Sequence, residues 1–540
     1  MNVLSGHLLR RATFVAGVAL VVGALGAVPI VASAAPSIPG SGRTLPANTR
    51  FYVPPPAQGS VQQELKLLLS RQVKEAGLIA AMEATPQAVW LDGETSAEAL
   101  HGNLGSQQAD LQVQQQVRQT MFGAALERAV PVLVAYNIPG RDCSQYSAGG
   151  APSDAAYDAW INSLAQGLGN GKAVVILEPD ALANLPSDCS PAYQAAAAKL
   201  GITDATREAD VAYGVTKLET DPNASVYIDG GHSAWQNVGD TVNSSKPPIV
   251  TKLGIAHRLV LANVVKAQGF FLDVSNYQYA TNNVFFGTWV SDCIAYTTVV
   301  NPGAAQGSLG SVGGTFANNC PGQYWNGGPS GTEIATLLGA WTGVALSPYG
   351  VWSETTTTAA LNTSGEDAQY AGELGATVPA SHFVIDTSRD GLGPNNMATY
   401  AATPDDQDSG VIAMLQAGNW CNPPGSGTGI LPTANTAGIP AALNSYQTVP
   451  SLLDAYLWVK TPGQSDGQCD AAGGVRTWSD TEYTPHIAGW PAITAGNFQT
   501  FDPLWSLQTG TVFTDPAAGA WFPQQALQLA ENAKPALRFP

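Results

Sequence analysis

Three aspartates in this chain follow apolar runs, at positions where acid-base chemistry could take place. Asp142 lies in "YNIPGRDCSQYSAGG", Asp180 in "LEPDALAN" and Asp466 in "WVKTPGQSDGQCD". Where carboxyl groups gather, like-charge repulsion raises the pKa of one of them, which can then stay protonated and donate to a leaving group. For each aspartate alone, helix capping or binding of loop amides is the better explanation. The three together, with tryptophans beside two of them, favour an acid-base hydrolase.

The elements that must position these aspartates are six apolar, β-branched runs, each followed by polar residues and a helical stretch. The runs span 129–139, 173–180, 225–232, 269–276, 382–388 and 452–460. Continuous apolar strands that alternate with helices predict an α/β fold whose parallel sheet is covered on both faces. Six such units predict barrel-like closure, with catalytic groups at the carboxyl ends of the strands. The polar residues at those ends include Asp142, Asp180, Asp229, His232, Asn276, Asp386 and Lys460.

The second run, "AVVILEPDALANL", places two carboxylates one residue apart. Pro179 ends the strand because it cannot donate to the sheet. Glu178 still lies close to the strand, so we interpret it as a structural hydrogen-bonding partner. Asp180, one step further out, reaches the rim of the barrel, and its working partner is expected to be Asp142.

Helical patterns occupy the stretches between the strands. Apolar spacing of three and four residues predicts one helix over residues 60–83. A second helix is predicted near Ser153. A third and long one is predicted from Ser190, which is an N-cap placed before Pro191 at the first turn.

Composition excludes some classes of function. Only 12% of the 540 residues are charged, and the formal net charge is −18. Such a surface repels phosphate backbones, so we predict no nucleic-acid partner. The six histidines and six cysteines show no metal-ligand spacing, and no metal or other cofactor is predicted.

The N-terminus has the pattern of a secretory signal peptide. Arg10 and Arg11 precede an apolar stretch that ends in a small-residue cleavage pattern at Ala34. We predict cleavage near Ala34, export and no stable membrane association afterwards. A retained membrane anchor is the alternative, because the apolar stretch is almost long enough to span a bilayer.

The rest of the chain is predicted to form one domain. Residues 35–50 are a flexible lead-in, and residues 51–540 are a single hydrolase domain without an accessory carbohydrate-binding module. Two segments, 279–335 and 470–518, are too long for simple connections and are interpreted as functional loop insertions. We expect a monomer. In an exported chain, the cysteines at 143, 189, 293, 320, 421 and 469 indicate disulfides. Six cysteines allow 15 connectivities, of which sequential pairing is the simplest.

Several segments resemble glycoside hydrolase family 6, the inverting cellulases. They are "VAYNIPGRDCSQYSAGG", "VVILEPDALANL", "VYIDGGHSAW", "DVSNYQ", "FVIDTSRDGLGP", "NWCNPPGSGTG", "LWVKTPGQSDG" and "GAWFPQQALQLAENA". They occur in family order from about residue 50 to 535. The resemblance implies a distorted β/α barrel with long rim loops over a cleft, and hydrolysis of β-1,4-glucosidic bonds with inversion.

The resemblance also implies roles for particular residues. Asp180 is expected to be the general acid, and Asp142 the carboxylate that assists it and relays a proton from the attacking water. Tyr136 is expected to crowd the sugar ring at the cleavage point, and Asp466 matches the disputed candidate base. Cys143–Cys189 and Cys421–Cys469 match disulfides of the family, which supports sequential pairing.

Sugar contacts are implied in the same way. Trp235 and Trp420 match the sugar platforms of the family, and Trp90 is the best candidate for a third; ordinary core packing is the alternative for each. His232, Asn276 and Lys460 match residues that bind sugar hydroxyls. Asp229 is explained as readily by pairing with His232 as by binding a ligand.

Two departures from the family pattern affect the site. Gln464 stands where the family usually has Glu, so one sugar contact loses its charge. Ala148 stands where many members have a Ser that holds the attacking water, which leaves the path of the water open. Long rim loops would suit a tunnel, so endo-action is only slightly favoured over cellobiohydrolase action.

Two other classes of protein remain as alternatives. "GHSAW" around Ser233 is close to the G-x-S-x-G motif of lipases and esterases, but Trp235 replaces the final glycine. A non-catalytic glucan-binding protein would share the fold. The presence of Asp142, Asp180, Asp466 and Tyr136 argues against it.

Overall fold

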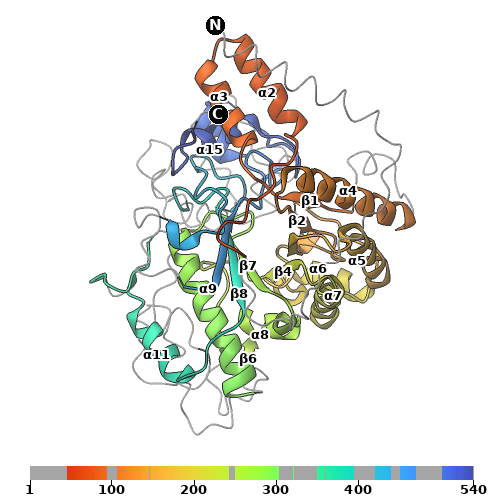
Figure 1. Ribbon diagram of the computed structural model, residues 1–540, viewed down its shortest axis with the longest axis vertical. Coiled ribbons are helices and arrows are strands. Elements are labelled where there is room, and N and C mark those ends of the chain that lie inside the picture. Colours follow the sequence, from red (N-terminus) through yellow and green to blue (C-terminus); the bar gives the residue numbers. More distant parts are fainter. Residues whose placement is uncertain are drawn as a thin grey trace. The chain divides into compact units, whose positions relative to one another are not determined.

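A sheet of seven parallel strands forms the centre of the computed structural model (Figure 1). In order across the sheet, the strands are β1 (Val89–Leu91), β2 (Val132–Ala135), β3 (Ala173–Leu177), β4 (Ala224–Asp229), β7 (Gly269–Leu272), β8 (His382–Asp386) and β9 (Leu453–Leu457). All six neighbouring pairs are parallel, which confirms the predicted α/β fold. The structure describes residues 45–93, 106–144, 146–242, 250–302, 320, 350–358, 361–394, 420–439, 450–469, 502–511 and 513–538.

Both faces of the sheet are buried, in two separate clusters of apolar side chains. On β3, Val175 and Leu177 pack with the covering helices, whereas Val174 and Ile176 face the interior with residues from other strands. Successive side chains of a strand point to opposite faces, so both sets must be apolar. This burial explains the continuous apolar runs of the sequence.

The two edges of the sheet approach each other through what we call the seam, at Ala88 and Trp458. Ala88 N donates a hydrogen bond to Trp458 O (3.0 Å), and Trp90 Nε1 donates to Val459 O (2.8 Å). The sheet is therefore curled toward a barrel, as predicted. β1 was not among the predicted strands, because a strand of three residues gives little periodic signal.

Helices surround this sheet, and α4 and α5 lie side by side next to β1 and β2 (Figure 1). The α-helices are α2 (Gln58–Leu69), α3 (Val73–Glu83), α4 (Ser106–Glu127), α5 (Asp154–Leu168), α6 (Pro191–Lys199), α7 (Asp204–Leu218), α8 (Ile255–Leu261), α9 (Ala280–Ala295), α11 (Ser364–Leu374), α14 (Pro503–Thr509) and α15 (Pro523–Glu531). Short helical turns are η1 (Asp142–Ser144), η2 (Pro186–Asp188), η3 (Val264–Lys266), η4 (Tyr296–Val300) and η9 (Thr436–Gly438). A small antiparallel pair, β5 (Thr241–Val242) and β6 (Val250–Lys252), completes the elements.

Two helix predictions need correction, one because the helix is interrupted and the other because the helix ends early. Residues 60–83 form two helices, α2 and α3, because Arg71 has a φ of 61° and interrupts the helix. Ser190 is the N-cap of α6, as predicted, and α5 begins near Ser153, as predicted, with Ser153 as its N-cap. However, α6 ends at Lys199, and α7 begins only after Gly201, whose φ is 78°.

The predicted loop insertions are only partly described. Residues 279–335 begin with α9, a helix buried along most of its length, and not with a loop. The last part of 470–518 contains α14. Most of the remainder, like the predicted signal peptide, lies outside the described residues. No helix in the described part of the chain is long and apolar enough to cross a membrane.

Three disulfides follow the sequential pairing. They join Cys143 to Cys189, Cys293 to Cys320 and Cys421 to Cys469. The first ties the loop after β2 to the region after β3, and the third ties the loop that carries Asp466 to Cys421. Two of the three therefore fix segments that carry predicted catalytic aspartates.

Candidate active site

The loops after β2 and β3 carry Asp142 and Asp180 in an unusual backbone conformation. Asp142 and Asp180 have φ values of 55° and 66°, and Cys143 and Glu178 beside them have 48° and 56°. Residues other than glycine rarely adopt positive φ, and they persist there only where surrounding contacts hold them. The two loops are therefore shaped by contacts and not by local preference.

Asp142, Ser147 and Tyr136 form a hydrogen-bonded chain. Ser147 donates to Asp142 Oδ2 from its backbone N and from its Oγ, both at 2.8 Å. Ser147 Oγ and the Tyr136 hydroxyl lie 2.9 Å apart. Ser147 therefore contacts both Asp142 and Tyr136, whereas its neighbour Ala148 is exposed.

The environment of Asp180 favours its protonated form. Burial raises the pKa of Asp180 well above its usual value, and the neighbouring charges of Asp229, Asp142 and Asp466 raise it further. Burial also raises the pKa of Asp142, although the two hydrogen bonds from Ser147 oppose this shift. Of the two carboxyl groups, Asp180 is the better proton donor and Asp142 the better proton acceptor.

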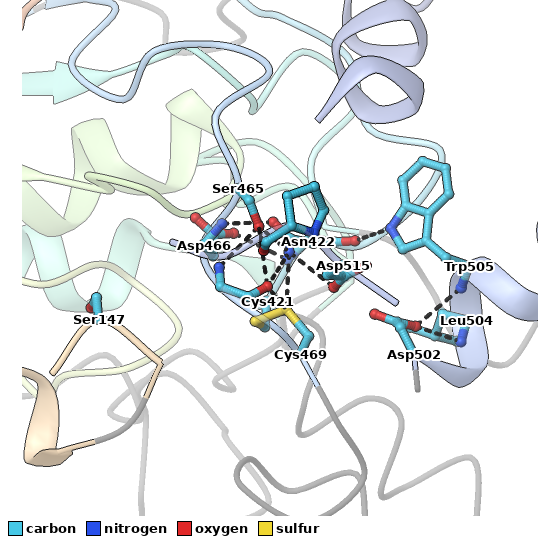
Figure 2. Close-up of a disulfide and its surroundings, with 12 residues drawn as sticks. Ser147, Cys421, Asn422, Ser465, Asp466, Cys469, Asp502, Leu504, Trp505 and Asp515 are labelled. Carbon is cyan, nitrogen blue, oxygen red and sulfur yellow. Dashed lines mark hydrogen bonds between the residues drawn. A yellow bond between two sulfur atoms is a disulfide. The ribbon is translucent and has the colours of Figure 1, made fainter. Parts of the chain in front are cut away.

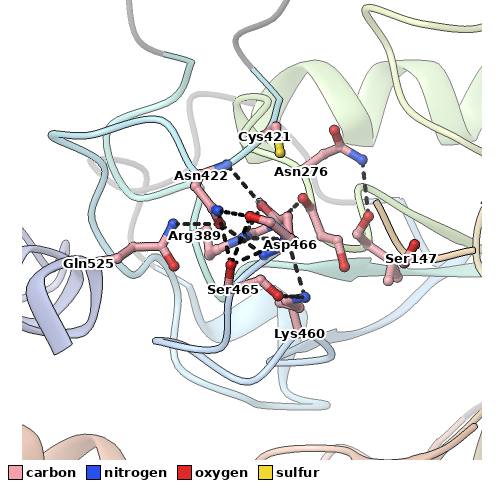
Figure 3. Close-up of polar contacts among 12 residues, drawn as sticks. Ser147, Asn276, Arg389, Cys421, Asn422, Lys460, Ser465, Asp466 and Gln525 are labelled. Atoms are coloured by element: carbon pink, nitrogen blue, oxygen red, sulfur yellow. Dashed lines mark hydrogen bonds and ion pairs between the residues drawn. The ribbon is translucent and has the colours of Figure 1, made fainter. Parts of the chain in front are cut away.

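Asp466 lies in a cage of positive charges (Figure 3). Arg389 Nη1 contacts both of its oxygens, at 3.0 and 2.8 Å, and Lys460 Nζ lies 3.2 Å from Oδ1. The backbone N of Asn422 donates to Oδ2 at 3.0 Å. Burial alone would raise the pKa of Asp466, but Arg389 and Lys460 hold it below its usual value. Asp466 is therefore ionised, with its lone pairs already engaged.

Asn422 connects this cage to the nearby disulfide (Figure 2). Its Nδ2 lies within hydrogen-bond distance of Ser465 Oγ, Gly467 O and Asp515 Oδ2, and its carbonyl oxygen accepts from Trp505 Nε1. Because Cys421 precedes Asn422 and is bonded to Cys469, the disulfide and the amide hold the same turn. This turn fixes the backbone of Asp466, whose N donates to Asn422 Oδ1 at 2.8 Å.

One group of described side chains has the spacing of a metal site, but its chemistry does not suit one. Cys469, Asp502 and Asp515 come within 4.8 Å of one another. A cysteine binds metal as a thiolate, and Cys469 is in a disulfide. Asp502 caps α14 by accepting from Leu504 N and Trp505 N. We interpret the group as structural.

Glu178 and Asp229 bind backbone N–H groups of the two loops that carry Asp142 and Asp180. Glu178 is fully buried and accepts hydrogen bonds from the backbone N of Asn137 and of Ile138, which agrees with its predicted structural role. Asp229 accepts from Leu182 N, Ala183 N and Gly231 N. These contacts correct the suggested pairing of Asp229 with His232.

Two predicted sugar-binding residues, Trp90 and Lys460, lie beside the predicted catalytic residues Tyr136 and Asp466. The ring of Trp90 meets that of Tyr136 edge-on, with centroids 5.3 Å apart, and Lys460 Nζ lies 5.7 Å from the Trp90 ring centre. Trp90 is half-buried and packs against the apolar cluster inside the sheet. The structure therefore brings Trp90, Tyr136 and Lys460 together, and Lys460 links them to Asp466.

The other predicted contacts occupy neighbouring loops. His232 and Trp235 have ring centroids 5.6 Å apart, and both tryptophans, Trp235 and Trp420, are half-buried. Burial lowers the pKa of His232 to about 3, and its Nδ1 accepts from Ala234 N at 3.2 Å. The proton of the neutral ring is then on Nε2, where it can be donated. Among the described residues, no contact joins the loops of Trp235 and Trp420 directly to Asp180.

Asn276 and Gln464 are less defined by their contacts. Asn276 Nδ2 donates to Val274 O at 3.0 Å, and its loop is held by Arg389, which donates to Ser275 O. Gln464 is half-buried and pairs through its backbone with Trp521. Trp420 packs against Tyr146, with ring centroids 5.8 Å apart.

The sequence did not single out three buried arginines that organise this site. Arg389 holds Asp466, Arg141 donates to Tyr136 O (2.6 Å) and Ser147 O (2.9 Å), and Arg207 binds the loops of both catalytic aspartates. For two of them the signal was compositional: because the chain has only 23 basic residues, Arg141 in "RDC" and Arg389 in "TSRDG" are conspicuous.

The fold and the cluster of carboxyl groups define a hydrolase site of the acid-base type, and the family follows from a sequence comparison. The model of "Glycosyl hydrolases family 6" matches residues 46–533. The chain therefore belongs to glycosyl hydrolases family 6, as its motifs predict.

Known relatives are similar over most of this chain. "Endoglucanase A" of Cellulomonas fimi is 27% identical over 428 residues, which are 79% of this chain and 58% of that protein. "Exoglucanase A" of Cellulomonas fimi is 26% identical over 86% of this chain and 46% of that protein. The chain thus spans about half the length of these relatives. Among solved structures, the Mycobacterium tuberculosis endoglucanase Cel6, in complex with a thio-linked cellobioside, is 25% identical with a TM-score of 0.46; 90% of this chain and 98% of that chain are covered.

Proposed function

We propose that this protein is a secreted β-1,4-glucanase that hydrolyses cellulose or related glucans with inversion. The observation that carries the proposal is the pair of carboxyl groups at the ends of neighbouring strands: Asp180, whose pKa is raised well above its usual value, and Asp142, whose Oδ2 accepts two hydrogen bonds from Ser147. One protonated and one accepting carboxyl group are what an inverting glycosidase needs. Family membership and the names of the relatives support the substrate class.

In the proposed reaction, Asp180 protonates the glycosidic oxygen as the bond to the anomeric carbon breaks. A water molecule attacks the opposite face of that carbon, and its proton passes to Asp142. Ser147 holds Asp142 Oδ2 through two hydrogen bonds, and in the proposal the other oxygen takes the proton from the water. Tyr136, bonded to Ser147 and covered by Arg141, would limit the space for an undistorted sugar ring.

We assign Asp466 an electrostatic role and not that of the base. A base needs an oxygen that can take a proton, but Asp466 is bound by Arg389, Lys460 and Asn422 N, and its pKa is lowered. Its negative charge raises the pKa of Asp180. Asp466 thus helps to keep the acid protonated and neutralises Lys460 and Arg389.

Sugar binding is assigned to the aromatic and polar groups around this centre. Trp90, Trp235 and Trp420 are half-buried, so one part of each ring remains accessible for the C–H face of a glucose unit. His232, Asn276, Lys460 and Gln464 are proposed to bind hydroxyl groups. We propose endo-action, because three relatives of this chain are named endoglucanases.

The test compares viscosity loss with release of reducing ends on carboxymethylcellulose, together with product anomer analysis by NMR on cellohexaose. A steep early loss of viscosity and initial α-anomeric products are expected. Cellobiose as the sole product without viscosity loss would establish exo-action instead. Absence of any cleavage, with cellohexaose still bound, would establish a non-catalytic glucan-binding protein.

A further inference from the structure

Arg207 contacts the loops of both catalytic aspartates. It lies in the first turns of α7 and is almost fully buried. Its Nη2 donates to Pro139 O (2.8 Å) and Gly140 O (3.1 Å), just before Asp142. Its Nη1 donates to Ala181 O (3.4 Å), the residue after Asp180. One guanidinium group therefore joins two loops that follow neighbouring strands.

Glu178 binds the other polar groups of the same loop segment. The backbone N–H groups of Asn137 and Ile138 donate to the Glu178 carboxyl, whereas the carbonyls of Pro139 and Gly140 accept from Arg207. All four peptide groups are thus bound by one of these two buried side chains. The two carbonyls are bound by the charged guanidinium, and hydrogen bonds to charged groups are stronger than those between neutral ones.

The helix that carries Arg207 is itself anchored to the region after β3. Thr203 and Thr206 form a capping box at the start of α7, and Asp204 Oδ1 accepts from Ser187 N at 2.9 Å. The guanidinium is thus held from a regular element and not from a mobile loop. Such a support can transmit a fixed geometry to both loops.

We propose that Arg207 is a positioning residue that sets the spacing between the Asp142 and Asp180 carboxyl groups. The proposal deepens the proposed function and rests on it for its effect on turnover. Inverting hydrolysis needs its two carboxyl groups about 6.5–9.5 Å apart, so that a water fits. Because both loops have strained backbones, their spacing depends on groups that bind both of them. Arginine suits this place because its rigid fork directs donors to several acceptors, whereas lysine is a point charge.

The test uses Arg207→Lys with Arg258→Lys as the matched control. Arg258 is also buried, but of the two loops it contacts only that of Asp180, through Leu182 O (2.8 Å); its other partners are Leu253 O and Asp188. We expect R207K to lower kcat on cellohexaose about 10- to 100-fold, since small misplacement of reacting groups has effects of that order. KM should change less than threefold. R258K should lose similar thermal stability but less than threefold in kcat.

Hydrogen exchange gives a readout that does not depend on turnover. In R207K, amides of both 137–141 and 180–184 should exchange faster, whereas R258K should affect only the second segment. If the wild type hydrolyses nothing, the proposed function fails, while the exchange pattern still decides whether Arg207 couples the loops. The proposal is overturned if R207K exchanges in one segment only, or if its kcat matches that of R258K. It is also overturned if both R207K and R207Q fail to fold, because Arg207 would then be structural.

Discussion

Arg389 and Asp466 face each other through two N–O contacts of 2.8 and 3.0 Å, in a site that excludes almost all solvent from both side chains. This pair, together with Lys460, places two cations and one anion beside the proposed acid Asp180. A carboxylate in such a pair is stabilised in its charged form. This pairing distinguishes Asp466, whose charge raises the pKa of Asp180, from a carboxylate that takes up a proton in the reaction.

Replacement of Asp466 by Asn should cost stability and shift the pH profile. Arg389 and Lys460 would be left buried without their counterion, which typically costs about 3–5 kcal/mol. Loss of the Asp466 charge should also lower the pKa of Asp180, so the alkaline limb of kcat should move to lower pH. Thermal melting and a pH–rate profile check both effects.

Asp454→Asn is the control for the loss of a buried carboxylate. Asp454 binds Tyr227, Gln268 and His382 away from Asp180. D454N should lower the melting temperature without a shift of the alkaline limb. If azide restored the activity of an Asp466→Ala variant, Asp466 would act as the base and our assignment would be wrong.

Replacement of Asp180 by Asn should abolish the protonation of the leaving group. General acid catalysis typically contributes about 10²–10⁴-fold to the rate. We therefore expect a loss of that size on cellohexaose, but a much smaller loss on 2,4-dinitrophenyl cellobioside, whose leaving group needs no proton. Equal losses on both substrates, measured as kcat, would contradict the role of Asp180 as acid.

Replacement of Ser147 by Ala should raise the pKa of Asp142. The Ser147 hydroxyl donates to Asp142 Oδ2, and this hydrogen bond lowers the Asp142 pKa. Asp142 must be ionised to accept a proton, so the acidic limb of the pH–rate profile should move to higher pH. We expect about a tenfold loss of kcat at pH 5 and a smaller loss at pH 7. Ala148→Ser, a change beside it, should leave the acidic limb in place; an unchanged limb in S147A would disprove the relay.

The folded protein should be more stable at pH 5 than at pH 8. Burial raises the pKa of Glu178 and of Asp210 to about 7, well above the value of an unfolded chain. Between pH 4.5 and 7 these two groups bind more protons in the folded state than in the unfolded state, and through them the free energy of unfolding falls as pH rises. Each unit of pKa difference corresponds to about 1.4 kcal/mol per group.

Thermal melting between pH 4.5 and 8 measures this slope. Asp210→Asn should flatten it, because one of the groups with a raised pKa no longer titrates. Arg118, which is exposed on α4, offers a control in Arg118→Gln with an unchanged slope. A melting temperature that rises from pH 5 to pH 8 would contradict the prediction.

The sequence predicted six of the strands well, because strands buried on both faces consist almost entirely of apolar residues. The six apolar runs correspond to β2, β3, β4, β7, β8 and β9, whose residues are buried on both faces. Helix breaks were harder to predict. Arg71 interrupts the first helical stretch through a left-handed backbone, a conformation that the periodicity of its neighbours does not reveal.

The sequence singled out the residues proposed to react, but not the residues that bind their loops. Asp142 and Asp180 stand in recognisable motifs at strand ends. In contrast, Arg207 binds carbonyl oxygens of loops about 26 and 67 residues away, and backbone acceptors leave no signature in the sequence. Likewise, this chain has Ala148 where many family members have a serine, and the sequence alone did not show that the neighbouring Ser147 binds Asp142.

The seam between Ala88 and Trp458 has a consequence for how the protein folds. It joins strands that are first and last along the sheet, and Gln63 near one end of the chain bonds to Pro523 and Trp521 near the other. Contacts of such high sequence separation slow folding, because the loop entropy is lost before the contact forms. A nascent chain from which β9 has not yet been synthesised lacks Lys460 and Asp466, and so carries the proposed acid Asp180 without the charges that shift its pKa. If the proposed function holds, catalytic activity is expected only after synthesis of the whole sheet.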